Sequence, residues 1–229
     1  MNWEDHSRDV PKGAHALFSG SNYAWTNIDM DDEEKFEESI RNIYYSRFAK
    51  DVGTIIHAWA ADRIFYRMNV VKSDSRSLFI YIMTEYEKLT HEPMPRNVAS
   101  YYVDRCFPNV MTYIKDAIGF RLDPEIKLMY TNEFYGTADV IAYKKGEYLR
   151  IHDLKTGLLS AKLRQLEVYA AFCCLEYGID PREISLIELR IYQNDEVLIH
   201  TPQADEIAPI IDKIIGFDKL INRIKEREA

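Results

Sequence analysis

Two acidic residues and a lysine stand near the middle of the chain, and their types and spacing suit a divalent metal ion and a water molecule. Asp139 closes the stretch Gly136-Thr-Ala-Asp, and Asp153 and Lys155 belong to Asp-Leu-Lys. Hard cations such as Mg²⁺ take oxygen ligands from carboxylates and backbone carbonyls. The carbonyl of Leu154, between the two side chains, is therefore a further candidate ligand. The chemistry that this set predicts is metal-assisted hydrolysis.

The strands predicted around these residues bring them to one end of a sheet. Alternating apolar and polar residues predict strands over 125–130, 136–143 and 147–153. Lys144-Lys145-Gly146 has the length and the glycine of a three-residue hairpin turn. A hairpin that turns there places Asp139 opposite residues 151–152, and so beside Asp153 and Lys155. Asp153 and Lys155 are two residues apart and are expected on the same face.

An acid two residues before a lysine is not informative by itself, since a solvated strand edge explains it equally well. The pattern occurs three times, at Glu33/Lys35, Glu125/Lys127 and Asp153/Lys155. Only the third copy follows Asp139 on the other arm of a predicted hairpin. Only it precedes a predicted helix in which Gln165 and Tyr169 are four residues apart and share one face. The combination favours the third copy as a site.

Helices are predicted for most of the first half of the chain and for its end. Apolar residues at three- and four-residue spacing predict helices over 36–67, 77–89, 97–118, 161–177 and 206–228. Gly53 is a candidate break within the first of them. A second hairpin is expected from strands 184–192 and 197–200, around Gln193-Asn-Asp-Glu196. We therefore expect one domain, with a mainly helical region 1–120, a catalytic sheet and helix over 121–200, and a closing helix within 201–229.

Composition narrows the class of protein further. The chain has 229 residues, of which 47% are apolar, enough for a sizeable core. Proteins that coat nucleic acid non-specifically are normally basic, whereas this chain has a net charge of −8. DNA binding would therefore need a local basic patch or metal ions held by carboxylates. No apolar run suits a membrane span or a secretion signal, which predicts a cytoplasmic protein. Three cysteines without CxxC spacing exclude a zinc ribbon and leave too few thiols for an iron–sulfur cluster.

Taken together, the motifs GTAD, DLKTG and QLEVYA resemble the PD-(D/E)XK nucleases of the RecB and lambda-exonuclease type, which include many viral exonucleases. Members of that family carry a GxxD strand, a (D/E)xK strand and a QxxxY helix in this order. Gly53-Thr-Ile-Ile-His57 is similar to the upstream helix that supplies a metal-binding histidine in many members. The resemblance covers about residues 53–200, and residues 15–25 are loosely similar to the openings of phage-encoded members. Ala138 replaces the proline of the family's name.

The resemblance implies a fold and a set of roles. The fold would be α/β, a restriction-endonuclease-like core with a mixed central sheet flanked by helices and a helical N-terminal region. The implied metal ligands are His57, Asp139, Asp153 and the Leu154 carbonyl. Lys155 would orient or deprotonate the attacking water, and Gln165 and Tyr169 would contact the DNA backbone or position that water. Further candidates are Glu133 as an acid behind the ligands, and Lys162 and Arg164 as phosphate contacts.

The function that the resemblance implies is that of a Mg²⁺- or Mn²⁺-dependent deoxyribonuclease, and an exonuclease that hydrolyses DNA from its ends in recombination, repair or phage DNA processing. DNA is the expected partner, and a recombinase or annealing protein, a helicase or further copies of the chain are candidate partners. A structure- or site-selective endonuclease of the same fold is the first alternative. A non-catalytic DNA- or protein-binding member, or a structural domain with accidental motifs, are the others.

Overall fold

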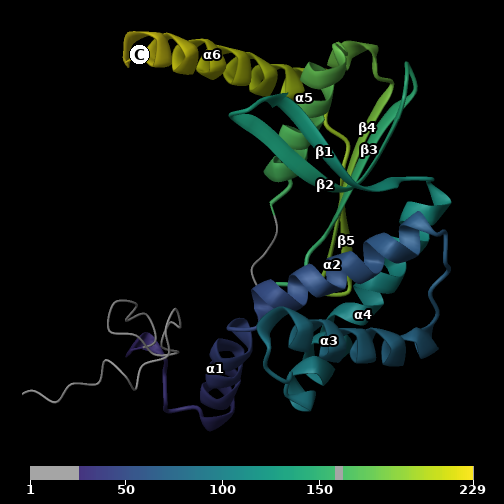
Figure 1. The fold of residues 1–229 in the computed structure, drawn as a ribbon, viewed down its shortest axis with the longest axis vertical. Coiled ribbons are helices and arrows are strands. Elements are labelled where there is room, and N and C mark those ends of the chain that lie inside the picture. Colours follow the sequence, from purple (N-terminus) through teal and green to yellow (C-terminus); the bar gives the residue numbers. More distant parts are fainter. Residues whose placement is uncertain (1–25, 158–161, 229) are drawn as a thin grey trace, which may run out of the picture. The chain divides into compact units, whose positions relative to one another are not determined.

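The computed structural model describes residues 26–157 and 162–228, and every structural statement below refers to these residues (Figure 1). The chain divides into two compact units, residues 1–50 and 51–229. The described part of the first unit contains helix α1 (Glu33–Ser46), whose N-terminus is capped by the Asp32 side chain, 3.2 Å from the Lys35 amide. The segment 15–25, with its expected likeness to phage proteins, lies outside the described residues.

The order of elements predicted from the sequence is confirmed. After α1 come α2 (Ala49–Phe65), η2 (Lys72–Asp74), α3 (Ser75–Thr90), α4 (Arg96–Gly119), β1 (Asp123–Thr131), β2 (Phe134–Lys144), β3 (Tyr148–Leu154), α5 (Arg164–Tyr177), η3 (Pro181–Glu183), β4 (Leu186–Gln193), β5 (Glu196–His200) and α6 (Ala204–Glu228). The single helix expected over 36–67 was wrong, because α1 and α2 are separate helices. Gly53 is not the break and lies inside α2, since a glycine costs a helix only about 1 kcal/mol.

The five strands form one mixed sheet in the order β1-β2-β3-β4-β5. β3 and β4 are parallel, joined by the crossover that contains α5, and the other neighbours are antiparallel. A hydrophobic core joins the strands to α5 and α6, with Leu149, Leu189 and Leu166 fully buried in it. In Figure 1, α5 lies alongside the upper part of the sheet, α6 extends across the top of the view, and α2, α3 and α4 gather at the lower end of the sheet. The coarse expectation of an α/β fold with a mixed sheet flanked by helices is thus confirmed.

Helix α4 packs on β3 and β4 through a polar network. Asp116 accepts hydrogen bonds from Arg190 at 3.0 Å and from the Tyr192 hydroxyl at 2.7 Å. That hydroxyl is also 3.2 Å from Nδ1 of His152, which is fully buried. Burial, together with the positive charges of Arg190 and Arg150, lowers the pKa of His152 to about 3. His152 is therefore a neutral core residue at physiological pH, although it adjoins Asp153 in sequence.

The two predicted hairpins have tight turns that the sequence encodes directly. Gly146 adopts a left-handed φ of +74°, and Lys144 pairs with Tyr148. Val140 pairs with His152, so continued pairing sets Asp139 opposite residue 153, one residue beyond the prediction. In the second hairpin, Asn194 and Asp195 have positive φ angles of 52° and 60°. None of the described helices is both long enough and apolar enough to cross a membrane.

Candidate metal centre

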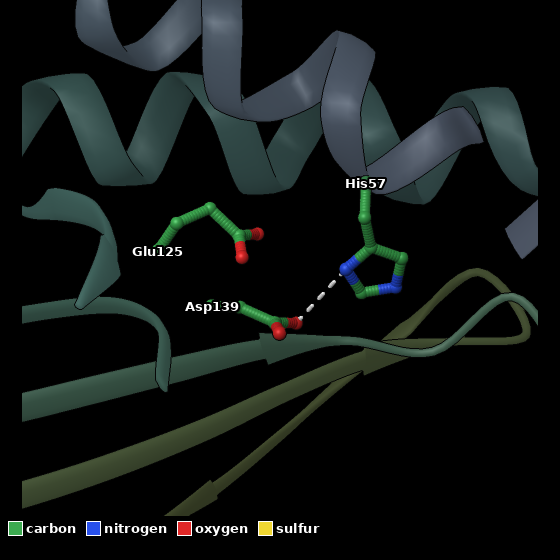
Figure 2. A group of neighbouring side chains, drawn as sticks. All are labelled: His57, Glu125 and Asp139. Atoms are coloured by element: carbon green, nitrogen blue, oxygen red, sulfur yellow. Dashed lines mark ion pairs between the residues drawn. The ribbon is translucent and has the colours of Figure 1, made fainter. Parts of the chain in front are cut away.

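Three potential metal ligands from three separate elements converge between α2 and the sheet. His57 comes from α2, Glu125 from β1 and Asp139 from β2, and Figure 2 shows their side chains directed at one another. Each offers one ligand atom, and these atoms lie within 4.8 Å of one another. Nδ1 of His57 is 3.3 Å from Oδ2 of Asp139. Burial lowers the pKa of His57, but the hydrogen bond and the charge of Asp139 outweigh it and leave the pKa above its usual value.

The Asp139 carboxylate is anchored to the end of the neighbouring strand. Its Oδ2 accepts a hydrogen bond from the Leu154 amide at 2.9 Å. The next amide, of Lys155, points the other way and donates to the Tyr192 carbonyl on β4 at 3.0 Å. In an extended strand, the amide and the carbonyl of one residue point to the same neighbour. The Leu154 carbonyl therefore lies on the side of Asp139, as a backbone ligand would need to.

A chain of polar contacts leads from Asp153 to α5. Lys155 Nζ is 3.0 Å from both carboxylate oxygens of Asp153 and also donates to Gln165 Oε1 at 3.0 Å. The amide of Gln165 in turn donates to the Tyr169 hydroxyl at 2.8 Å. Four residues that the sequence singled out are therefore in direct contact.

The carboxyl group of Asp153 is buried, and Lys155 offsets its charge only in part. The residue is 3% exposed. Burial and the neighbouring Asp139 raise the pKa of Asp153 to about 6, against the opposing effects of Lys155 and His57. Its Oδ2 lies within ion-pair distance of Lys155 but finds no hydrogen-bond donor among the described residues. A cation beside Asp139 and Asp153 would relieve both deficits.

Two glycines permit the close approaches that hold this arrangement together. A Cβ on Gly136 would lie 2.6 Å from Cε1 of Tyr169, so the glycine lets the tyrosine ring pack directly on β2. A Cβ on Gly53 would lie 2.9 Å from Oγ1 of Thr156, immediately after Lys155. Gly53 therefore brings α2, and with it His57, close to the end of β3. Both glycines belong to the motifs that carried the resemblance.

The remaining candidates from the sequence lie apart from the cluster. Glu133 occupies the β1–β2 turn and forms an ion pair with Lys225 of α6. It is six residues from Asp139 along the hairpin, or about 20 Å at the rise of a strand, and the structure does not bring it to the site. Arg164 pairs with Glu167 at 2.6 Å on α5, and Lys162 is exposed, with its backbone carbonyl accepting a hydrogen bond from the Gln165 amide at 3.4 Å.

Glu125 is the site residue that the sequence interpretation missed. Its only signal was an acid two residues before a lysine, which was set aside because the pattern recurs. Glu125 has a left-handed φ of +54°, a strained conformation for a residue other than glycine. Partial burial and the charge of Asp139 raise its pKa, against the effect of His57. Strain and like-charge crowding at one residue are typical of functional sites.

Protein-family models, curated proteins and solved structures contain no match to this chain. The interpretation of the site therefore depends on its geometry and on the motifs. One imidazole nitrogen and several carboxylate oxygens form a donor set that suits Mg²⁺ or Mn²⁺, with the imidazole favouring Mn²⁺.

Proposed function

We propose that the protein is a metal-dependent deoxyribonuclease of the PD-(D/E)XK type. The observation that carries the proposal is the convergence of His57, Glu125 and Asp139 beside a carboxylate–lysine–glutamine chain. Asp153 and the Leu154 carbonyl would complete the ligand set. A purely structural cluster would not need three acidic side chains near one another with raised pKa values at two of them.

The residues around the cluster have distinct parts in the proposed hydrolysis. When bound, the cation supplies Lewis-acid charge that polarises the scissile phosphate and makes water a better nucleophile. Lys155 would orient that water and offset charge on the phosphate, because its ammonium is held between Asp153 and Gln165, 3.0 Å from each. Tyr169 acts through Gln165 as a positioning residue, since its hydroxyl receives the glutamine amide hydrogen bond.

A protein of net charge −8 would otherwise repel DNA. Cations held by carboxylates turn an acidic pocket into a phosphate site, so local basic residues need only guide the strand. We further propose that the enzyme acts on DNA ends, as the resemblance to exonucleases implies. An endonuclease of the same fold would use the same cluster.

The experiment is a cleavage assay with end-labelled linear DNA and closed circular DNA, each with Mg²⁺, Mn²⁺ or EDTA. We expect linear DNA to be degraded with either metal and to survive in EDTA. Asp139→Asn should abolish cleavage, while Asp29→Asn, outside the cluster, serves as the matched control and should cut at the parent rate. Undiminished cleavage in EDTA would refute the proposed role of the metal. Circles nicked as fast as linear DNA is degraded would assign the endonuclease activity instead.

A further inference from the structure

A second concave site lies between α2 and α3 and has no part in the proposed hydrolysis. It is a cavity of about 430 Å³, within the size range of small-molecule sites. It has aromatic walls, supplied by Trp59, Tyr66 and Tyr81, and a few polar groups. Trp59 is 2% exposed, whereas Tyr66 is 68% exposed and offers its ring to an incoming group.

Arg63 lines this cavity with unused hydrogen-bonding capacity. Its guanidinium stacks 4.8 Å from the centroid of Trp59. Its other hydrogen bonds to described residues are weak ones, to the Ser77 hydroxyl at 3.4 Å and the Met68 sulfur at 3.5 Å. Within residues 26–157 and 162–228, no carboxylate lies within ion-pair distance of Arg63. A guanidinium has five donors in a planar fork, and its preferred partner is a carboxylate or a phosphate.

The cavity also has acidic side chains, and one of them, Asp62, adjoins Arg63 in sequence. Glu85 lies eight residues beyond Ser77 on α3, which corresponds to about 12 Å along the helix axis. Asp62 lines the cavity as well, and Lys88 pairs with Glu85 at 2.7 Å. Burial and the charges of Glu85 and Asp62 raise the pKa of Tyr81, consistent with both acids lying near its hydroxyl. Glu85 is thus offset by Lys88, and Arg63 is the charged group of the cavity that keeps donors for a ligand.

We propose that this cavity binds a nucleoside monophosphate unit, with the phosphate on Arg63 and the base over Tyr66. A nucleotide has the two groups that these side chains suit, an anionic phosphate for the Arg63 guanidinium and a flat base for the Tyr66 ring. Stacking on an aromatic side chain contributes about 1–3 kcal/mol per base.

The site is separate from the metal centre, although both use α2. Arg63 is six residues beyond His57, about 9 Å along the axis and on a different side of the helix. The nucleotide could be a free metabolite or an unpaired residue of a nucleic-acid strand. The inference depends on the cavity alone and would hold if the protein cut no DNA.

Binding is best measured by calorimetry in EDTA, with the full chain and with Asp139→Asn. EDTA keeps metal ions from the metal centre, so a failure of dGMP to bind would not count against the proposed nuclease activity. We expect dGMP to bind equally to both proteins, and deoxyguanosine and inorganic phosphate to bind at least tenfold more weakly. A 5′-phosphorylated oligonucleotide ending in dG serves as a second ligand. Tighter binding of the oligonucleotide assigns the site to a strand, and equal binding assigns it to the free nucleotide.

Variants at the cavity then locate the site. Arg63→Gln should weaken dGMP binding at least tenfold, and Arg63→Lys should weaken it less. The matched control is Arg76→Gln, an exposed arginine next to Ser77 that does not line the cavity. Thermal unfolding shows whether each variant is folded. Quenching of Trp59 fluorescence by dGMP, in a chain with Trp3→Phe and Trp25→Phe, gives an independent signal. Inorganic phosphate binding as tightly as dGMP, or full affinity in folded Arg63→Gln, would overturn the proposal.

Discussion

Replacing Glu125 by glutamine removes one carboxylate from the metal cluster and nearly preserves the side-chain volume. Glu125 and Asp139 offer oxygens within 4.8 Å of each other. At an effective dielectric constant near 20, two charges 4.8 Å apart repel by about 3.5 kcal/mol. His57 and solvent reduce this repulsion, so we expect metal-free Glu125→Gln to be more stable than the parent by about 1 kcal/mol. For a chain of this size, that corresponds to a melting temperature higher by roughly 2–4 °C.

The same substitution should weaken metal binding, because a ligand is lost along with the repulsion. Mn²⁺ stabilises the folded protein in proportion to the logarithm of its concentration over its Kd. We expect the Mn²⁺-induced rise in melting temperature to shrink in Glu125→Gln, and the Kd from calorimetry to rise at least tenfold. A rise in metal-free stability together with a fall in metal affinity is the signature of a functional carboxylate cluster.

Glu133→Gln is the matched control for Glu125→Gln. Glu133 lies in the turn between β1 and β2 and forms a partly exposed ion pair with Lys225. Loss of this ion pair should lower the stability by at most about 1 kcal/mol. The Mn²⁺ response of this control should equal that of the parent. The reasoning fails if Glu125→Gln lowers metal-free stability by more than about 1 kcal/mol and responds to Mn²⁺ as the parent does.

The backbone at Glu125 offers an independent check. A φ of +54° suits glycine, and a left-handed conformation costs other residues roughly 1–2 kcal/mol. Glu125→Gly should therefore keep the stability within about 1 kcal/mol of the parent, because relief of strain offsets the entropy of the glycine. Glu125→Val should destabilise the protein by a further 1–3 kcal/mol or so, since β-branched residues resist this conformation. Chemical denaturation measures both, and equal stability of the two variants would contradict the assigned φ.

Three further predictions concern other residues. Lys155→Ala should lower the single-turnover cleavage rate by roughly two to four powers of ten, with near-parental Mn²⁺ affinity by calorimetry; a parental rate would remove Lys155 from the chemistry. Gly136→Ala should destabilise the fold by roughly 1–3 kcal/mol, because its Cβ would meet the Tyr169 ring at 2.6 Å, and adding Tyr169→Ala should recover part of this loss in denaturation experiments. His152 has a pKa of about 3 when folded and about 6.5 when unfolded, so the stability from its neutral form is complete above pH 6.5 and is lost as the pH falls toward 3. Between pH 6 and 4, His152→Phe should show a shallower decline than the parent, by up to about 1.4 kcal/mol per pH unit, in denaturant titrations; equal slopes would show that His152 titrates normally.

Local features of the sequence determined most of the helices and strands, and they also determined that Asp139 and Asp153 lie near each other. Gly146 and the pair Asn194-Asp195 specify tight turns by their tolerance of positive φ, so both hairpins could be predicted. The turn at Gly146 brings Asp139, midway along β2, opposite Asp153 near the end of β3, within one residue of the expected register. These contacts depend on a few residues that are close together in sequence, so the spacing of those residues is enough to predict them.

The contact of Lys155 with Gln165 was not predicted from the sequence, which only placed both residues in motifs of one candidate site. Strand β3, the crossover and helix α5 must pack as a unit before the lysine meets the glutamine at 3.0 Å. The reason that Gly136 is a glycine also becomes visible only in three dimensions, where the Tyr169 ring occupies the space of a Cβ.

Only the tertiary structure decided which acids belong to the cluster. Glu125 joins it because β1 pairs with β2 and because an unusual φ occurs at that residue, and neither follows from its neighbours in sequence. Glu133 was assigned by its nearness to Asp139 in sequence, but a hairpin extends away from its turn, and the residue lies at the far end. Ligands from α2, β1 and β2 meet through long-range packing, in which the energy is spread over the whole core, so no single segment encodes their convergence.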